Sequence, residues 1–289
     1  MDRLKERTVS VRGKDLTRAN FRRLVDGLDS LPSVPLVAQK VGEMVHNPRN
    51  DARAIANVMK GDPALSAKVL KIVNSPYYGI PGGVSDVTRA ISFLGFSTIH
   101  ELVLTVSVFE AFKDARGESS HALFRHSLAV AGAAEAVAQI IGHATPAECF
   151  TAGLLHDLGR LAMLQIDPAI SAEPRAEDEL HEFVGDRLAA RWRFPLGLRA
   201  AIAHHHEVDV GRRGKVAKHL HSIIDVIALA DVICKRQGYG VIDEEPPPLP
   251  KDVLDRLNLL GNIEETAHDR LRWNLERSEV LMRVLVGDA

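Results

Sequence analysis

The sequence has few cysteines and few aromatic residues. Only Cys149 and Cys234 occur among its 289 residues, and Phe, Trp and Tyr together make up 5% of the chain. Two cysteines cannot provide a disulfide framework, so we expect a reducing compartment in which both are small core residues. The scarcity of aromatic rings means that the core must be built mainly from aliphatic side chains.

A surplus of charge of either sign is lacking as well. The 36 Lys and Arg residues nearly balance the 38 Asp and Glu residues, which leaves a formal net charge of −2. This balance argues against nucleic acid or an anionic membrane as the default partner. No stretch reaches the roughly 18 uncharged apolar residues of a membrane span, and residues 1–14 lack the apolar core of a signal peptide. We therefore expect a cytoplasmic protein.

Helical periodicity, in contrast, runs through most of the chain. Hydrophobic residues make up 46% of the sequence and recur at spacings of three and four, without the sustained alternation that is typical of half-buried strands. Asp62 precedes a proline, as at many helix starts, and Thr98 and Glu101 have the spacing of a capping box. Gly95 and Gly142 lie where helices should end. The predicted fold class is therefore all-α.

We expect four parts along the chain. We expect an N-terminal arm with the first helix over 1–23, a multi-helix subdomain over 24–115, a longer-helix bundle over 116–242, and a proline-rich connector with a C-terminal helix over 243–289. The C-terminal helix could pack on its own bundle or support a homodimer. The expected helices are 15–28, 35–47, 51–60, 63–74, 85–94, 97–113, 121–141, 146–165, 176–193, 196–206, 216–237 and 263–286.

Histidine and aspartate residues lie in otherwise apolar helices of the second half. His126 has apolar neighbours three and four positions away, and Asp231 is a carboxylate among Ile, Ala and Cys side chains. A buried carboxylate is costly unless a positive or hydrogen-bonding group compensates it. Each residue alone has a structural explanation, such as a hydrogen-bonded core histidine or an Asp231–Arg pair. Together, imidazole and carboxylate ligands suit Fe, Mn or Zn, and a carboxylate can bridge two ions.

The order of these residues resembles the ligand pattern of the HD superfamily of metal-dependent phosphohydrolases. The wider context resembles the HDOD family, the HD-related output domain of bacterial signalling proteins, over about residues 24–236. The matching stretches are LPSVPLVAQKV, DPALSAKVLKIVNSPYYG, AISFLGF, HSLAVA, AGLLHDLGRLAML, HEFVGDRLAARWRFP and AIAHHHE.

This resemblance implies an N-terminal helical subdomain packed on an HD-like helical bundle that holds divalent metal. By position, it implies two ions of Fe, Mn or Zn bridged by Asp157, with Asp157 and Arg160 as the catalytic residues. In the HHE stretch, His204 is then an extra residue outside the ligand set. The implied metal ligands are His126, His156, Asp157, His181, His205, His206 and Asp231.

Two departures bear on the activity. HD-GYP relatives, which hydrolyse cyclic-di-GMP, carry a Gly-Tyr-Pro loop shortly after HHE, whereas this chain continues VDVGRRGKVAKH. Hydrolysis of that dinucleotide is therefore disfavoured. Those relatives also commonly have Lys where this sequence has Arg160, although a guanidinium can hold a phosphate by two hydrogen bonds.

The leading hypothesis is a bacterial-type signalling protein with a dinuclear metal site and metal-dependent phosphohydrolase activity. Many family members are regarded as regulatory modules without demonstrated catalysis, so the alternative is a non-catalytic protein-interaction module. A third hypothesis is a nucleotide-sensing domain that binds a phosphorylated ligand without cleaving it. The expected partners are a signalling protein or a small phosphorylated ligand, with neither nucleic acid nor membrane involved.

Overall fold

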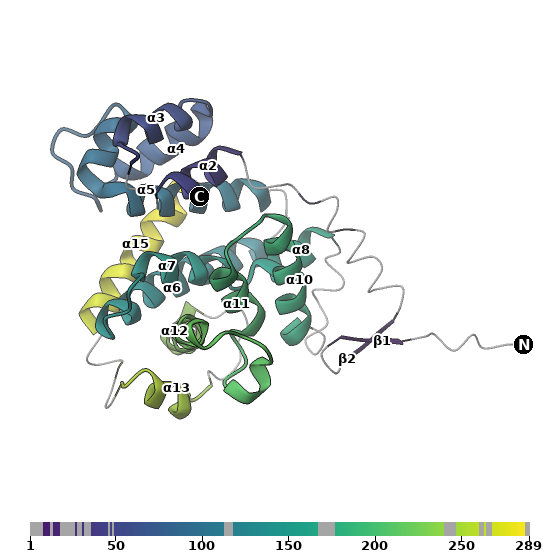
Figure 1. Cartoon of the computed structure of the whole chain (residues 1–289). Coiled ribbons are helices and arrows are strands. Elements are labelled where there is room, and N and C mark those ends of the chain that lie inside the picture. The colour runs from purple at the N-terminus through teal and green to yellow at the C-terminus, as the bar shows by residue number, and fades with distance from the viewer. Residues whose placement is uncertain are drawn as a thin grey trace, which may run out of the picture.

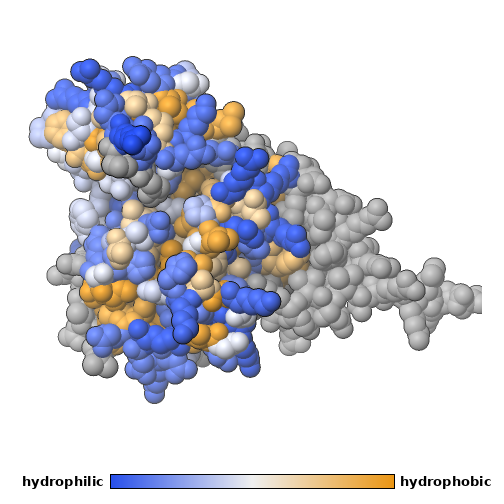
Figure 2. Space-filling view, in the orientation of Figure 1, coloured by the Kyte–Doolittle hydropathy of each residue, from blue (hydrophilic) through white to orange (hydrophobic). Residues whose placement is uncertain are grey.

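The structure is a computed structural model that describes residues 8–11, 14–17, 27, 31, 36–45, 47, 49–112, 118–166, 177–239, 247–259, 263 and 268–286. Helices make up almost all of its regular structure, which confirms the predicted all-α class (Figure 1). The face in Figure 2 is mainly hydrophilic, with smaller hydrophobic groups between.

A short hairpin in the N-terminal part was not predicted. Strands β1 (Thr8–Val11) and β2 (Lys14–Thr17) pair antiparallel, with Thr8 opposite Thr17. The helix expected over 15–28 is therefore wrong at its start, because residues 15–17 belong to β2; residues 18–26 and 28 lie outside the described residues. The β-branched residues of the TVSV strand favour extended backbone.

The next helices form one end of the molecule (Figure 1). The first three of them begin and end within two residues of the predicted bounds, which were 35–47, 51–60 and 63–74. The Asp62 carboxylate caps its helix as predicted, accepting a hydrogen bond of 3.0 Å from the backbone N–H of Leu65. The helices are α2 (Leu36–Val45), α3 (Ala52–Met59), α4 (Pro63–Val73) and α5 (Val87–Phe112).

Helix α5 is interrupted at Gly95, where a helix end was predicted. Gly95 has φ 80° and ψ 171°, a backbone conformation that glycine adopts without steric cost. Thr98 lies inside the helix that follows, so the predicted capping box is wrong: Glu101 is buried and pairs with Arg277 instead. By length and composition α5 could cross a membrane, but 56% of its most apolar window is buried inside the protein, as in a core helix.

The second half forms the larger bundle. The single helix predicted over 146–165 is wrong, because the chain turns at His156 and Asp157 between two helices. The helix expected over 216–237 starts later, after two 3-10 turns, η1 (Val210–Arg213) and η2 (Lys218–Leu220). The bundle helices are α6 (Glu118–Ile140), α7 (Pro146–Leu155), α8 (Leu158–Ile166), α10 (Glu177–Arg191), α11 (Leu196–His204) and α12 (His221–Cys234).

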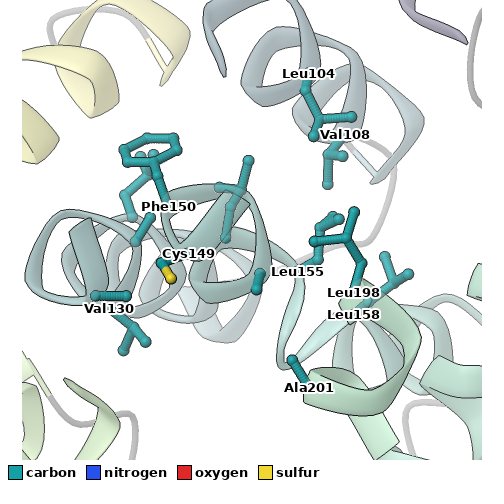
Figure 3. Close-up of a cluster of buried hydrophobic side chains, with 14 of the residues drawn as sticks. Leu104, Val108, Val130, Cys149, Phe150, Leu155, Leu158, Leu198 and Ala201 are labelled. Carbon is teal, nitrogen blue, oxygen red and sulfur yellow. The ribbon is translucent and has the colours of Figure 1, made fainter. Parts of the chain in front are cut away.

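The core joins the two halves and is largely aliphatic. Leu104 and Val108 of α5 lie across from Leu155 and Leu158 in Figure 3, and all four are buried. Cys149 and Cys234 are buried and not bonded to each other, as expected. The buried hydrophobic residues from Leu31 to Met282 thus form one continuous apolar core.

Two glycines allow close helix contacts in the bundle. A Cβ atom at Gly153 of α7 would lie 2.7 Å from the Cα atom of Ala131 in α6. A Cβ atom at Gly159 of α8 would collide with the carbonyl oxygen of His181 in α10. Only glycine therefore fits at these two crossings, which bring α6, α7, α8 and α10 together around the turn at His156 and Asp157.

The C-terminal helix α15 (His268–Val286) packs against α4 and α6, which is one of the two predicted alternatives. Arg277 of α15 is 6% exposed and donates hydrogen bonds to Glu101 of α5 (2.7 Å) and to Glu135 of α6 (3.0 Å). Its guanidinium also lies 4.7 Å from the ring centre of Phe150 in α7. Helix α13 (Lys251–Arg256) was not predicted, and residues 247–250 of the expected connector have no regular structure.

We expect Arg277→Met to destabilise the protein by about 3–5 kcal/mol, because it leaves two buried carboxylates without their cation. The control is Arg272→Met in the same helix, whose pair with Glu276 is largely exposed (71% and 58%) and should contribute less than about 1 kcal/mol. Denaturant unfolding measures both variants.

The destabilisation caused by Arg277→Met should also depend on pH. Burial raises the pKa of Glu101 from 4.5 to about 7 although Arg277 opposes the shift, and burial likewise raises the pKa of Glu135. Without Arg277 both pKa values rise further, so the folded variant binds more protons than the unfolded chain. The stability of the variant should then fall as pH rises above about 4.5. Its free energy of unfolding should therefore lie closer to that of the wild-type protein at pH 5 than at pH 8. A deficit equal at both values would contradict this account.

Candidate metal centre

The turn between α7 and α8 places Asp157 at the centre of the bundle. His156 follows the last residue of α7, and the backbone carbonyl of Asp157 accepts hydrogen bonds from the N–H groups of Arg160 and Leu161 at the start of α8. Asp157 is 4% exposed and His156 is 1% exposed. The interruption of the helix therefore turns two adjacent polar side chains into the protein interior.

The two carboxylate oxygens of Asp157 face two different groups of imidazoles. Oδ2 lies 3.4 Å from Nε2 of His156 and 3.8 Å from Nε2 of His126 on α6. Oδ1 lies 3.4 Å from Nε2 of His181 on α10 and 3.7 Å from Nε2 of His205 after α11. A carboxylate in this position can reach two cations at once.

All seven predicted ligand residues are brought together. Two groups could each hold a cation, with their ligand atoms within 4.8 Å of one another: His126, His156 and Asp157, and Asp157, His181, His205 and His206. Asp231 of α12 adjoins the first group, since its Oδ1 lies 3.1 Å from Nε2 of His126. His206 is the exception in burial, because its side chain is 32% exposed at the edge of the cluster.

Backbone carbonyls fix the orientation of three imidazoles. Nδ1 of His126 lies 2.7 Å from the carbonyl oxygen of Tyr239, Nδ1 of His156 lies 2.7 Å from that of Gly153, and Nδ1 of His205 lies 3.0 Å from that of Ile202. A carbonyl can only accept, so each Nδ1 carries the proton and donates it. In a ring that carries only this proton, Nε2 is a lone-pair donor that faces the cluster.

Asp157, Asp231 and His156 are in charge states that suit a cation. Burial lowers the pKa of His156 from 6.5 to about 4, which keeps this imidazole neutral. Burial opposes ionisation of Asp157, but the Arg160 guanidinium beside it holds the pKa of this carboxyl well below its usual range. Burial also opposes ionisation of Asp231, but the Lys235 ammonium beside it holds the pKa of this carboxyl well below its usual range. Neutral imidazoles and ionised carboxylates are the forms that coordinate metal ions.

The hydrogen bonding of two buried atoms in the cluster shows whether these residues fit a metal ion. Nε2 of His156 and Oδ1 of Asp231 have no hydrogen-bond partner among the residues that the structure describes. A buried acceptor without a partner costs free energy, and such atoms need an explanation. Both are lone-pair donors on the side of the first group, so a divalent cation there would satisfy them.

The remaining predicted site residues lie at the edge of the cluster. Nε of Arg160 donates to Oδ1 of Asp157 over 3.1 Å, and the side chain is 14% exposed. His204 is the last residue of α11 and belongs to neither candidate group.

Three residues that hydrogen-bond to the predicted ligands were not identified from the sequence. Nζ of Lys235 donates to Oδ2 of Asp231 over 2.7 Å, and Oε1 of Glu182 accepts a hydrogen bond of 3.3 Å from the backbone N–H of His206. Tyr239 contributes its backbone carbonyl. Lys235 stands four residues after Asp231, a spacing that places both on one helix face and could have been noticed.

The segment after the HHE stretch is anchored by buried charge. Arg213 is fully buried and donates to the carbonyl oxygen of Glu207 (2.8 Å) and to the carboxylate of Asp225 (2.5 Å). Arg256 of α13 donates to the same carboxylate over 2.8 Å. Helix α13 thereby holds this segment, and with it the end of α11, against α12.

Comparison with known proteins identifies one domain family. A family model described as HDOD domain matches residues 31–208. An HDOD domain protein with unknown function from Geobacter sulfurreducens has a TM-score of 0.70 at 25% identity, over 91% of this chain and 95% of that chain. A protein of Shewanella amazonensis SB2B named "Putative metal-dependent phosphohydrolase" has a TM-score of 0.63 at 20% identity, over 91% and 96% of the two chains.

Among curated proteins, an uncharacterised protein of Treponema pallidum (strain Nichols) is 26% identical over 252 residues. That match covers 80% of this chain and 47% of the relative, so the chain spans about half the length of the curated relative it matches. The family match covers more than half of the present chain and agrees with the helical neighbours. The chain belongs to the HDOD domain family, as its sequence motifs predicted.

Proposed function

We propose that this protein binds two divalent metal ions and is a metal-dependent phosphohydrolase of bacterial-type signal transduction. One observation carries the proposal: each of the two oxygens of Asp157 lies nearest a different pair of imidazole nitrogens. A structural site for one ion needs a single convergent set of ligands. Two sets that share a carboxylate are what a pair of bridged ions requires.

The two proposed positions differ in their ligands. The first is formed by His126, His156 and Asp231 with Oδ2 of Asp157. The second takes three imidazoles and Oδ1 of Asp157, from the group His181, His205 and His206. Nitrogen and carboxylate ligands of this kind suit Fe, Mn or Zn.

The residues of the chain support phosphate chemistry at this place. When bound, two ions would lower the pKa of water and neutralise charge on a phosphate. Asp157 would hold both positions at a fixed separation, and the backbone carbonyls would keep the imidazoles oriented without substrate. Arg160 lies beside Asp157 with part of its side chain exposed, where a guanidinium can donate to phosphate oxygens as charge develops in the transition state.

Cyclic-di-GMP is not the substrate that we propose. The segment that follows HHE carries no Gly-Tyr-Pro sequence and instead forms η1, whose Arg213 is buried against Asp225. We propose a phosphomonoester, a nucleotide or another phosphodiester, and a cytoplasmic location.

A non-catalytic regulatory module is the second candidate, and the burial of the cluster favours it. Six of the seven predicted ligands are at most 4% exposed, and the partly exposed side chains beside which a substrate could approach are those of His206, Lys235 and Arg160. In this case the ions would hold the helices together, and a signalling protein or a small phosphorylated ligand would bind elsewhere.

Elemental analysis of protein purified without chelators or a metal-affinity tag should find about two equivalents of Fe, Mn or Zn. Asp157→Ala should lose most of both ions, because it removes the shared carboxylate. His156→Ala should lose mainly one, since this imidazole faces only Oδ2 of Asp157. Folded wild-type protein that holds no metal and cannot be reconstituted would reject the proposal.

The histidine run provides a matched pair of variants for the same measurement. His205→Ala should lower the metal content, because Nε2 of His205 faces His181 (3.2 Å) and Asp157. His204→Ala, one residue earlier, should keep it. If both variants retained metal equally, His205 would not be a ligand.

Activity separates the two candidate functions. Protein loaded with Mn or Fe should hydrolyse at least one phosphate ester in a broad screen, with little turnover of cyclic-di-GMP. Asp157→Ala should abolish turnover, whereas Arg160→Ala should lower it by about 10²- to 10³-fold by removing one charged donor. A blank screen with fully loaded protein, together with a partner interaction that survives Asp157→Ala, would favour the regulatory module.

A further inference from the structure

A single turn of the chain contacts two of the predicted ligands, at atoms other than those that face the first candidate group. Segment η3 (Lys235–Tyr239) is a π-helical turn that continues α12 directly after Cys234. Its first residue, Lys235, holds Asp231, and its last residue, Tyr239, accepts the hydrogen bond from His126. Turns of this type are rare and are frequently found at functional sites.

At the Lys235 end, the ammonium group selects one oxygen of Asp231. Nζ lies 2.7 Å from Oδ2, while Oδ1 has no hydrogen-bond partner among the described residues and lies 3.1 Å from Nε2 of His126. The terminal torsion of an aspartate side chain is broad and roughly two-fold. The bond to Lys235 therefore fixes the carboxylate with Oδ1 facing the first candidate group.

At the Tyr239 end, the turn fixes the imidazole of His126. The carbonyl of Tyr239 accepts a hydrogen bond from Nδ1 of His126. The Arg125 guanidinium lies 5.8 Å from the centre of the Tyr239 ring. Gly238, just before Tyr239, has φ 82°, so the turn closes through a conformation that other residues rarely adopt. The orientation of His126 thus depends on the shape of this turn.

We propose that the turn Lys235–Tyr239 positions the His126 and Asp231 half of the metal centre, and that Lys235 is its main positioning residue. This inference rests on the proposed function. An ammonium group has no lone pair, so Lys235 acts on the ion through Asp231 and is not a ligand. It makes Asp231 bind through one oxygen and raises the affinity of the first position for its ion.

The charge of Lys235 acts in the opposite direction, because an ammonium repels a divalent cation. The side chain of Lys235 is 31% exposed, so water and salt screen this repulsion. Orientation of the ligand is not screened, and loss of such a partner of a ligand typically lowers metal affinity by about 10–100-fold. We therefore expect orientation to outweigh repulsion.

The test measures metal affinity in metal-free protein titrated with Mn²⁺, Zn²⁺ or Co²⁺ by calorimetry and by competition with a chromophoric chelator. Lys235→Met should weaken one of the two binding steps by about 10–100-fold and change the visible spectrum of Co²⁺ at that position. Lys235→Arg keeps a cationic donor and should restore most of the affinity. An affinity that rises in Lys235→Met would overturn the inference, because Lys235 would then be a competitor of the ion.

A second variant tests the other end of the turn and does not depend on Lys235. Gly238→Ala should weaken the same step, because alanine strains the turn that carries Tyr239. Gly214→Ala is its control: Gly214 also has a positive φ (64°), has no atom within 4 Å of its Cβ position and lies outside η3. If wild-type protein binds two ions and neither Lys235→Met nor Gly238→Ala changes the affinity, the inference alone fails. If wild-type protein binds none, the proposed function fails.

Discussion

Two ionised carboxylates buried among imidazoles are the constraint on which the rest of the structure depends. Asp157 and Asp231 are both nearly inaccessible, and a buried charge is tolerated only when it is paired or coordinates a cation. Arg160 and Lys235 supply part of the compensation, from the exposed edge of the cluster. The turn between α7 and α8 and the close contacts at Gly153 and Gly159 bring the imidazoles around Asp157, where divalent cations would supply the remainder.

Helix α6 connects this cluster to a second buried charge cluster. His126 faces the carboxylates, and nine residues later Glu135 pairs with Arg277 of α15, which also holds Glu101 of α5. Ser278 of α15 adds a hydrogen bond of 2.7 Å to the carbonyl of Leu128 in α6. The C-terminal helix therefore ties the N-terminal helices to the helix that carries the first histidine.

Local signals in the sequence were sufficient for the fold class and most helix bounds, whereas the set of candidate ligands came from the resemblance to a known family. Asp62 caps its helix and Gly142 takes φ 66° after α6, because these effects involve neighbouring residues only. Interactions between distant segments could not be predicted: Glu101 and Arg277 are 176 residues apart. The turn at His156 was missed because its residues are compatible with a helix, and His156 itself keeps helical backbone angles. The β-hairpin is short and lacks an alternating pattern long enough to recognise.

The central claim is that Asp157 bridges two ions. Crystals grown with Mn²⁺ would test it most directly, through an anomalous difference map recorded near the manganese absorption edge. The account predicts two peaks about 3.5–4 Å apart, one beside His126 and His156 and the other beside His181 and His205, each adjacent to one oxygen of Asp157. A single peak away from Asp157, or no peak in protein saturated with Mn²⁺, would contradict it.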